Sequence, residues 1–261
     1  MAGIFGTLVG LGGAFIVIPV LRIAFGVAPA LTAGISLVMV LANGISGSIG
    51  YLRQRRVDWR LALLIVSTGV PTSIVGALVV QRVSHAGFDL LYGAMLILLF
   101  FNVMRRRRES LMATPPVSDV TGMKERVLID AGGTEFRYFY NAKLTLAAGL
   151  FMGFVSSFFG IGGGVVFMTL AIAKFRMPVH IIAATSTVAM LLTAPVGVAT
   201  HAMAGDIEWS FALPLACGGL IGGQIGPQIG KRLSTPQLLT ALAYAMLIAA
   251  VALAARHLFP A

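Results

Sequence analysis

The chain has 261 residues, of which 58% are hydrophobic and only 11% are charged, and its mean hydropathy is +0.94. An ordinary soluble domain carries about a quarter charged residues, so the composition excludes a soluble globular protein and indicates a polytopic membrane protein. The net charge of +10 does not predict nucleic-acid binding. The basic residues lie beside apolar spans, where they set topology and face the headgroups of anionic membrane lipids.

Apolar stretches of about 20 residues, long enough to cross a bilayer as helices, recur along the chain. The first half predicts a broken segment followed by three helices, at 2–21, 30–52, 61–81 and 87–104. The second half predicts a segment interrupted by glycines followed by three helices, at 144–173, 180–203, 210–230 and 236–255. We therefore expect an all-α helical bundle with about eight membrane segments.

The stretch between the two halves is polar and begins with four consecutive arginines, Arg105 to Arg108. It also contains Pro115-Pro116 and Gly132-Gly133, which are typical of loops and turns. We interpret it as a cytoplasmic linker that carries a small hairpin at 127–140. The predicted organisation is a first transmembrane repeat at 1–104, a basic cytoplasmic linker at 105–143 and a second transmembrane repeat at 144–261.

The two halves are related by an offset of 150 positions that needs no gap. Under this offset Gly10, Gly12 and Gly13 fall on Gly160, Gly162 and Gly163, and Asp58-Trp59 falls on Glu208-Trp209. The second match uses both tryptophans of the chain, so it does not depend on the abundance of glycine. Internal repeats of this length are common in secondary transporters, which place the substrate site where the halves meet.

The lysines and arginines indicate how the halves are oriented. If the 144–173 segment enters the membrane and returns on the same side, 16 of these residues lie on the cytoplasmic side and 3 on the other. If the segment crosses once, the split becomes 13 to 6. The positive-inside rule favours the first arrangement, which makes the second half an inverted copy of the first.

The glycine runs give the sharpest prediction of a binding site. Glycines weaken helices and unpaired amides are costly in hydrocarbon, so Gly12-Gly13 and Gly162-Gly163-Gly164 predict helix breaks with a purpose. Each following half-helix would offer free N–H groups and the positive end of its dipole to an anion. The alternative is that these glycines only permit close helix packing, which is how we interpret Gly218, Gly222, Gly226 and Gly230.

Polar residues near the breaks are candidates for anion specificity. They are Ser36, Asn43, Thr185, Ser186, Thr187 and Gln224. Hydroxyls and amides can ligate an oxyanion without a fixed positive charge, so that binding does not prevent release. Each of them could instead be hydrogen-bonded to a neighbouring helix.

The sequence offers no sign of a proton relay or of enzyme chemistry. All nine carboxylates fall in predicted loops or at helix ends, and His201, near Asp206, is the nearest titratable candidate, although a structural role is the simpler interpretation. No zinc-type Cys/His cluster or nucleophile elbow occurs, and Cys217 is the single cysteine. We expect no enzyme activity, no metal and no cofactor. The membrane potential alone would drive export of an anion.

The two Gly-x-Gly-Gly runs, the downstream Thr185-Ser186 and the basic turn ending in Asp58-Trp59 together resemble the TauE/SafE family of bacterial membrane transporters. The resemblance covers nearly the whole chain outside the linker. It implies an inner-membrane carrier that exports sulfite or an organosulfonate such as sulfoacetate. The chain departs from a symmetric pattern because Ile35 is the counterpart of Thr185, and because the counterpart of Asn141 would lie before residue 1.

Two other functions remain open from the sequence. A passive small-anion channel would use the same pair of helix breaks. A non-transporting membrane subunit would anchor a partner through the basic linker at 105–143. The expected interactions are with a small sulfur oxyanion or sulfonate and with lipids, and the sequence is also compatible with a homodimer.

Overall fold

The computed structural model describes residues 2–9, 12–110, 123–175, 177–230 and 235–258. In the first half the helices are α1 (Ala2–Val9), α2 (Ala14–Ala24), α3 (Pro29–Arg53), α4 (Trp59–Val80) and α5 (His85–Ser110). A hairpin of β1 (Lys124–Ile129) and β2 (Glu135–Tyr140) follows. In the second half they are α6 (Ala142–Phe159), α7 (Gly164–Lys174), α8 (Val179–Met203), α9 (Trp209–Gly230) and α10 (Thr235–Leu258).

The predicted helical membrane protein is confirmed at the level of its class. Among the described residues, the four helices α3, α4, α6 and α8 are long and apolar enough to cross a bilayer. Residues 14–24, 85–101 and 243–253 form shorter apolar helices. The expected count of about eight membrane segments stays a prediction. One boundary moves, because α5 continues to Ser110, beyond the predicted end at 104.

Helix starts follow from ordinary capping chemistry. The carboxylate of Asp58 accepts hydrogen bonds from the backbone N–H groups of Arg60 and Leu61 and so caps α4. The side chain of Asn141 caps α6 in the same way. Such caps satisfy N–H groups that the first helical turn leaves without partners. α3 begins at Pro29, a residue that needs no N–H partner at that position.

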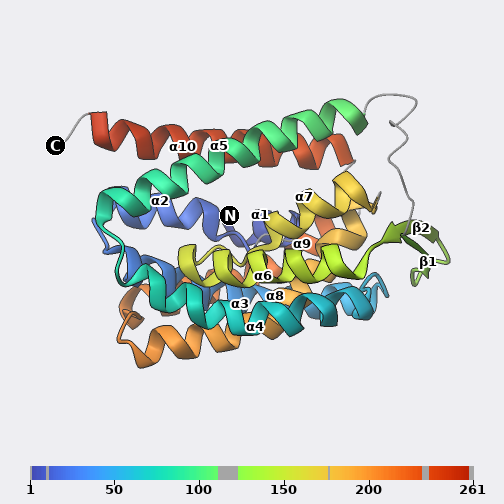
Figure 1. Ribbon diagram of the computed structural model, residues 1–261, viewed down its shortest axis with the longest axis horizontal. Coiled ribbons are helices and arrows are strands. Elements are labelled where there is room, and N and C mark those ends of the chain that lie inside the picture. Colours follow the sequence, from blue (N-terminus) through green and yellow to red (C-terminus); the bar gives the residue numbers. More distant parts are fainter. Residues whose placement is uncertain (1, 10–11, 111–122, 176, 231–234, 259–261) are drawn as a thin grey trace.

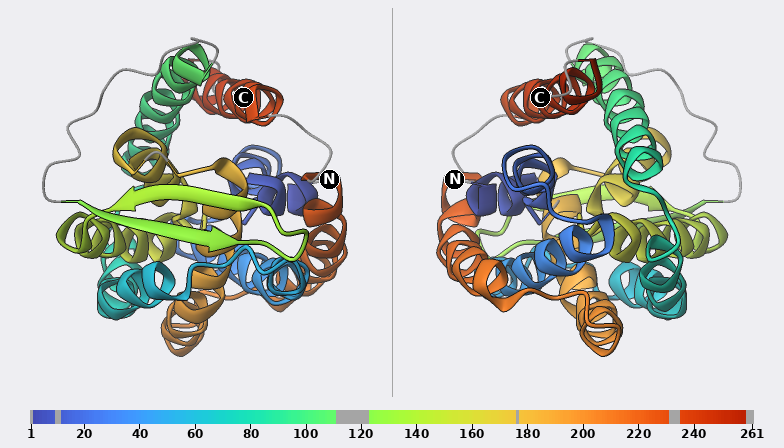
Figure 2. Two further views of the ribbon diagram at one scale, coloured as in Figure 1. Left: turned by 90° about the vertical axis from the view of Figure 1, so that its right-hand side faces the viewer. Right: turned by 90° about the vertical axis from the view of Figure 1, so that its left-hand side faces the viewer.

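The main contacts between the halves have counterparts under the repeat. α4 packs against α6 and, equivalently, α9 packs against α1; α3 packs against α9, and α8 against α4. α5 and α10 pack on each other and form a layer beside the other helices (Figures 1 and 2). The two halves are therefore interlocked rather than placed side by side.

The equivalent helices α3 and α8 run antiparallel to each other. A Cβ atom on Gly34, near the start of α3, would overlap the carbonyl oxygen of Asp206, just beyond the end of α8. A Cβ atom on Gly44, in the middle of α3, would lie 3.4 Å from the Cα of Leu191. Thr185, near the start of α8, is hydrogen-bonded to the residue before α4. The two helices therefore run in opposite directions along their contact, and the inverted arrangement of the halves stays a prediction.

Glycines allow several of these helices to touch backbone to backbone. On α9, Cβ atoms at Gly222 and Gly226 would collide with α1, and at Gly219 and Gly223 with α3. The predicted packing role of Gly222 and Gly226 is therefore confirmed. It is wrong for Gly218, where a Cβ atom would meet nothing within 4 Å.

The predicted hairpin is present and lies across one end of the bundle (Figure 2). Its strands pair antiparallel from Lys124 opposite Tyr140 to Ile129 opposite Glu135. It is attached to both halves, because Ala131 donates to the carbonyl of Gln54 after α3 and Phe139 donates to the carbonyl of Phe175 after α7.

Candidate functional site

The first helix break separates α1 from α2. Gly12 and Gly13 have φ of 74° and 79°, in the left-handed region that glycine adopts at little cost. A Cβ atom on Gly13 would overlap the carbonyl oxygen of Ala2. The break therefore requires glycine both for its backbone conformation and for the close approach of α1.

The second break, between α6 and α7, repeats this geometry. Gly160, Gly162 and Gly163 have φ of 81°, 81° and 66°, and Gly164 is the first residue of α7. A Cβ atom on Gly163 would overlap the carbonyl oxygen of Met152, which is the counterpart of Ala2 under the repeat. The predicted breaks are thus present in both halves, with the same close contact at equivalent positions.

Both breaks end at the start of a half-helix. The first N–H groups of any helix have no acceptor within that helix, and the helix dipole places partial positive charge at the same end. α2 and α7 each have 11 residues, and neither has a side-chain cap on its first turn. Chemically, each end is suited to an anion.

A single face of α3 contacts both breaks. A Cβ atom on Gly160 would overlap the carbonyl oxygen of Ala33, and a Cβ atom on Gly12 would lie 2.9 Å from Cγ2 of Val40. Ala33, Ser36 and Val40 share a face, because residues three, four and seven apart lie above one another on a helix. The two contacts are about 10 Å apart along α3, with Ser36 between them.

Ser36 is fully buried and its hydroxyl has no hydrogen-bond partner among the described atoms. Ser48 is the other buried side chain of which this is true. Buried polar groups are nearly always hydrogen-bonded, so a free hydroxyl between two helix breaks is unusual. Its place in a binding site stays a prediction.

The predicted hydroxyl cluster on α8 is fully buried as well. Thr187 donates to the carbonyl of Ala183 at 2.7 Å, and Ser186 donates to the same carbonyl at 3.3 Å. Thr185 makes a different kind of contact, because its Oγ1 accepts a hydrogen bond from the backbone N–H of Asp58 at 3.0 Å. It links the start of α8 to the start of α4.

Asn43 and Gln224, the predicted amides, have different surroundings. The side-chain amide of Asn43 donates to Gly3 O at 2.8 Å and Gly219 O at 3.2 Å, and its oxygen accepts from Thr7. Both of its donor hydrogens are thus engaged in joining α1, α3 and α9. Gln224 is exposed on α9 and donates to Ser46 O at 3.3 Å, so it does not lie with the buried hydroxyls.

Asp58 is the centre of a buried network that the sequence did not predict. Besides capping α4, its carboxylate pairs with Arg126 at 2.7 Å and accepts the hydroxyl of Tyr138. Burial raises the pKa of Tyr138, and the hydrogen bond to Asp58 adds to this shift, so the phenol remains a donor. The network fastens the hairpin to the bundle. The one sequence signal near it was the repeated Asp58-Trp59 motif.

A second buried ion pair joins α2 to α5. Arg22 and Asp89 form two hydrogen bonds of 2.7 and 2.8 Å, and both side chains are at most 1% exposed. The sequence placed both residues near helix ends but gave no sign that they meet. The pair fixes the end of α2 that lies away from the glycine break.

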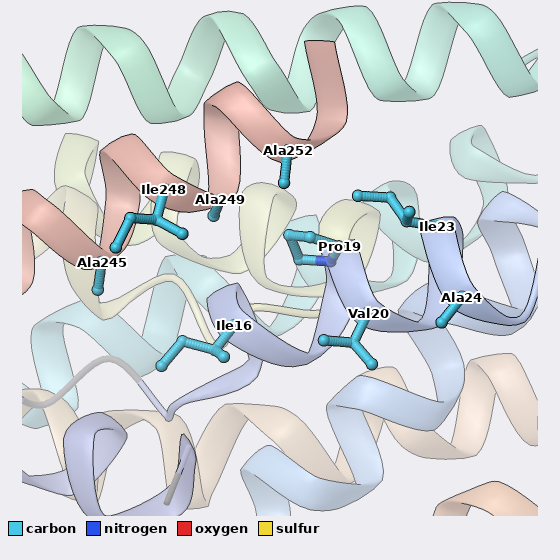
Figure 3. A pocket seen from close by; sticks show the side chains of 9 residues that line it. All are labelled: Ile16, Pro19, Val20, Ile23, Ala24, Ala245, Ile248, Ala249 and Ala252. Carbon is cyan, nitrogen blue, oxygen red and sulfur yellow. The ribbon is translucent and has the colours of Figure 1, made fainter. Parts of the chain in front are cut away.

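A cavity of about 410 Å³ lies between α2 and α10 (Figure 3). Its walls are formed entirely by aliphatic residues and proline, namely Ile16, Pro19, Val20, Ile23, Ala24, Ala245, Ile248, Ala249 and Ala252. An anion transferred there would lose its hydration without gaining hydrogen bonds. The cavity is therefore not the anion site that the breaks predict.

Discontinuous helices in each half of an internally repeated sequence are typical of secondary membrane transporters. The chain belongs to the family described as "Sulfite exporter TauE/SafE", which matches residues 1–253. The resemblance expected from the glycine runs and the Asp58-Trp59 turn is confirmed.

Relatives in other organisms carry transporter names. The chain is 26% identical over 242 residues to the probable membrane transporter protein YunE of Bacillus subtilis, covering 90% of this chain and 87% of the relative. It is 25% identical over 247 residues to a probable membrane transporter protein of Xylella fastidiosa, covering 94% and 87%. A probable membrane transporter protein of Methanocaldococcus jannaschii is 27% identical over 182 residues, covering 67% and 60%. No solved structure matches the chain.

Proposed function

We propose that this protein is an inner-membrane secondary transporter that exports a small sulfur-containing anion, either sulfite or an organosulfonate such as sulfoacetate. The observation that carries the proposal is the pair of equivalent glycine breaks against one face of α3. The substrate class comes from the name of the family, which is that of a sulfite exporter.

In this proposal the anion lies between the N-terminal ends of α2 and α7. Gly12, Gly13, Gly162 and Gly163 shape the two turns, and the first amides of α2 and of α7, from Gly164 on, donate to the anion. The hydroxyl of Ser36 donates from α3. Ser186 and Thr187 line the equivalent face of α8.

The remaining members of the predicted set hold the helices around the anion. Asn43 fixes α1 against α3 and α9, and Thr185 fixes α8 against the start of α4. Gln224 joins α9 to α3 at the carbonyl of Ser46. The described ion pairs of arginine involve Arg22, Arg56, Arg126 and Arg137, and all four lie outside the breaks. Binding at the breaks without these charges suits an anion that must be released again.

We place the hairpin end in the cytoplasm and treat the second half as an inverted copy of the first. The arginines around the α3–α4 turn and on the hairpin support this by the positive-inside rule, as do the antiparallel directions of α3 and α8. An inside-negative potential then favours export, since it supplies about 2.3 kcal/mol per elementary charge per 100 mV.

Cysteine labelling tests this orientation. In a Cys217→Ser background, a cysteine replaces either Ala131 in the hairpin turn or Met203 at the end of α8, both of which are exposed. An impermeant maleimide added to intact cells is expected to label Met203→Cys and to leave Ala131→Cys unlabelled until the cells are opened. The reverse pattern would invert the proposed topology.

Flux measurements in proteoliposomes test the transport function. Purified protein is expected to carry sulfite or sulfoacetate well above empty liposomes and to carry sulfate and chloride poorly. No flux of any sulfur oxyanion above the empty control would contradict the proposal. Counter-flow exchange separates a carrier from a passive channel, because only a carrier is accelerated by substrate on the opposite side.

A further inference from the structure

Two buried side chains occupy equivalent positions under the repeat and make equivalent contacts. Tyr51 on α3 and His201 on α8 are 150 residues apart, and both are buried. The hydroxyl of Tyr51 donates to the carbonyl of Thr7 at 2.6 Å. Nε2 of His201 lies 2.9 Å from the carbonyl of Ser157, which is the counterpart of Thr7.

Each contact is made on the helix that leads into a glycine break. Thr7 is in the last turn of α1, and Ser157 is in the last turn of α6. The carbonyl groups in the last turn of a helix have no N–H partner within that helix. Tyr51 and His201 therefore each supply a missing donor just before a break, one with a phenol and the other with a titratable ring.

The surroundings of His201 determine how many protons its ring holds. A neutral imidazole has one donor and one acceptor nitrogen. The Ser157 carbonyl can only accept, so Nε2 carries a hydrogen. Nδ1 lies 3.3 Å from Oδ2 of Asp206, and an ionised carboxylate also only accepts. A neutral ring beside an ionised carboxylate cannot form both hydrogen bonds. Both contacts are hydrogen bonds only if the His201–Asp206 pair holds one additional proton.

Asp206 is the titratable group that the described contacts place against this ring. From α6 the ring meets the Ser157 backbone, and the Ser157 hydroxyl in turn contacts that of Ser73 on α4 at 2.6 Å. One turn earlier on α8, the Cα of Gly197 faces these two hydroxyls and Leu37 of α3. The ring is 0% exposed and the Asp206 side chain 14% exposed, so the carboxylate gives the proton access to solvent.

The pair is also connected to the helix that carries Ser36. The carbonyl of Asp206 packs directly on Gly34 of α3, and Gly160 of the second break packs on Ala33. The turn after α8 and the second break thus contact neighbouring residues of α3. Loss of the proton would turn a hydrogen bond into a lone pair facing a carboxylate, so the Asp206 side chain would move away from the ring, while the backbone N–H of Asp206 still donates to the carbonyl of His201 at 2.8 Å.

We propose that the His201–Asp206 pair is a proton-binding site that controls the second helix break and thereby makes anion movement depend on pH. The protonated pair holds the turn after α8, the end of α6 and the start of α3 in the arrangement seen here. Loss of the proton removes the bond between the ring and the Asp206 carboxylate and so loosens this arrangement. The role in transport rests on the proposed function, whereas the proton site itself does not.

Histidine ring nitrogens observed by ¹⁵N NMR test the site without any substrate. The chain has four histidines, and the His201 signals are those missing from His201→Tyr protein. We expect a doubly protonated ring that loses one proton as the pH is raised. A ring that stays singly protonated at every pH would overturn the proposal, even if transport is robust.

Sulfoacetate flux tests the coupling, because its charge is constant near neutral pH whereas that of sulfite changes. Wild-type flux is expected to rise about tenfold as the proton is lost. His201→Tyr copies the arrangement of Tyr51 and should give fast flux at every pH. Asp206→Asn, whose amide can donate to Nδ1, should give slow flux at every pH. If either variant keeps the wild-type pH profile, the pair does not control the break.

Discussion

The first and second halves share the backbone of the helix break and differ in the side chains around it. Gly13 and Gly163 have similar left-handed conformations and face equivalent carbonyls, those of Ala2 and Met152. Around the breaks the halves diverge, since a free hydroxyl on Ser36 contrasts with the back-bonded hydroxyls of α8. What must be repeated is the backbone geometry, because no residue other than glycine fits it.

The outer parts of the halves diverge further. Asp58 is buried and fastens the hairpin, whereas its counterpart Glu208 is exposed, and the one described hydrogen bond of its carboxylate is to Ser210. Tyr51 holds its carbonyl with a phenol, whereas His201 uses an imidazole and brings in Asp206. The comparison teaches that the first half carries the buried Asp58 contact to the hairpin, whereas the second half carries the proposed proton site.

The largest expected effect comes from filling either break. Gly163→Leu and Gly13→Leu each place a side chain where a carbonyl oxygen lies, and we expect flux to fall about a hundredfold while the protein still elutes as a folded species in detergent. Gly93→Leu is the control, since a Cβ atom there meets nothing within 4 Å. Wild-type flux in one break variant but not the other would show that the two breaks are not equivalent.

The second effect concerns stability at the hairpin end. Asp58→Ala removes a helix cap and leaves the buried Tyr138 hydroxyl and the Arg126 guanidinium without their partner, which should cost about 2–4 kcal/mol of unfolding free energy. Glu208→Ala at the equivalent exposed position should change it by less than about 0.5 kcal/mol. Thermal unfolding in detergent measures both. Equal losses would mean that the two turns contribute alike.

A smaller loss of stability is expected for Asn43→Ala. Its amide joins three helices, and the carbonyls of Gly3 and Gly219 would lose a donor, at a cost of about 1–3 kcal/mol. The counterpart Thr193 has one hydrogen bond of its side chain among the described residues, to Ala189 O in its own helix, so Thr193→Ala should cost about 1 kcal/mol or less. A larger loss for Thr193→Ala, measured by the same unfolding assay, would contradict this difference between the halves.

The smallest expected effect is that of Ser36→Ala. Because the hydroxyl has no partner, its removal should leave stability within about 0.5 kcal/mol, whereas loss of a bond to the anion should weaken binding about two- to tenfold. Ser48→Ala is the matched control, since it removes the other unpartnered buried hydroxyl of α3. Unchanged anion affinity in Ser36→Ala, by calorimetry or flux, would remove Ser36 from the site.

Much of this arrangement was predictable from residues whose role is local. Glycine runs predict breaks because the backbone itself demands them, and Gly132-Gly133 predicted the hairpin turn. The side-chain partners were not predictable. The contacts of His201 with Ser157 and of Asp58 with Arg126 and Tyr138 join segments far apart in the chain, and no sequence pattern encodes such pairings. Ser36 was singled out by its repeat position, but its lack of a partner is visible only in the fold.

The interlocking of the halves has a consequence for biosynthesis. α1 and Asn43 need α9 to complete their packing and hydrogen bonds, yet Gly219 is synthesised more than 200 residues after α1. Because synthesis adds about 5–20 residues per second, α9 is completed roughly 10–40 s after α1. During that time lipid, or a chaperone of membrane insertion, must cover the small-residue surface of α1.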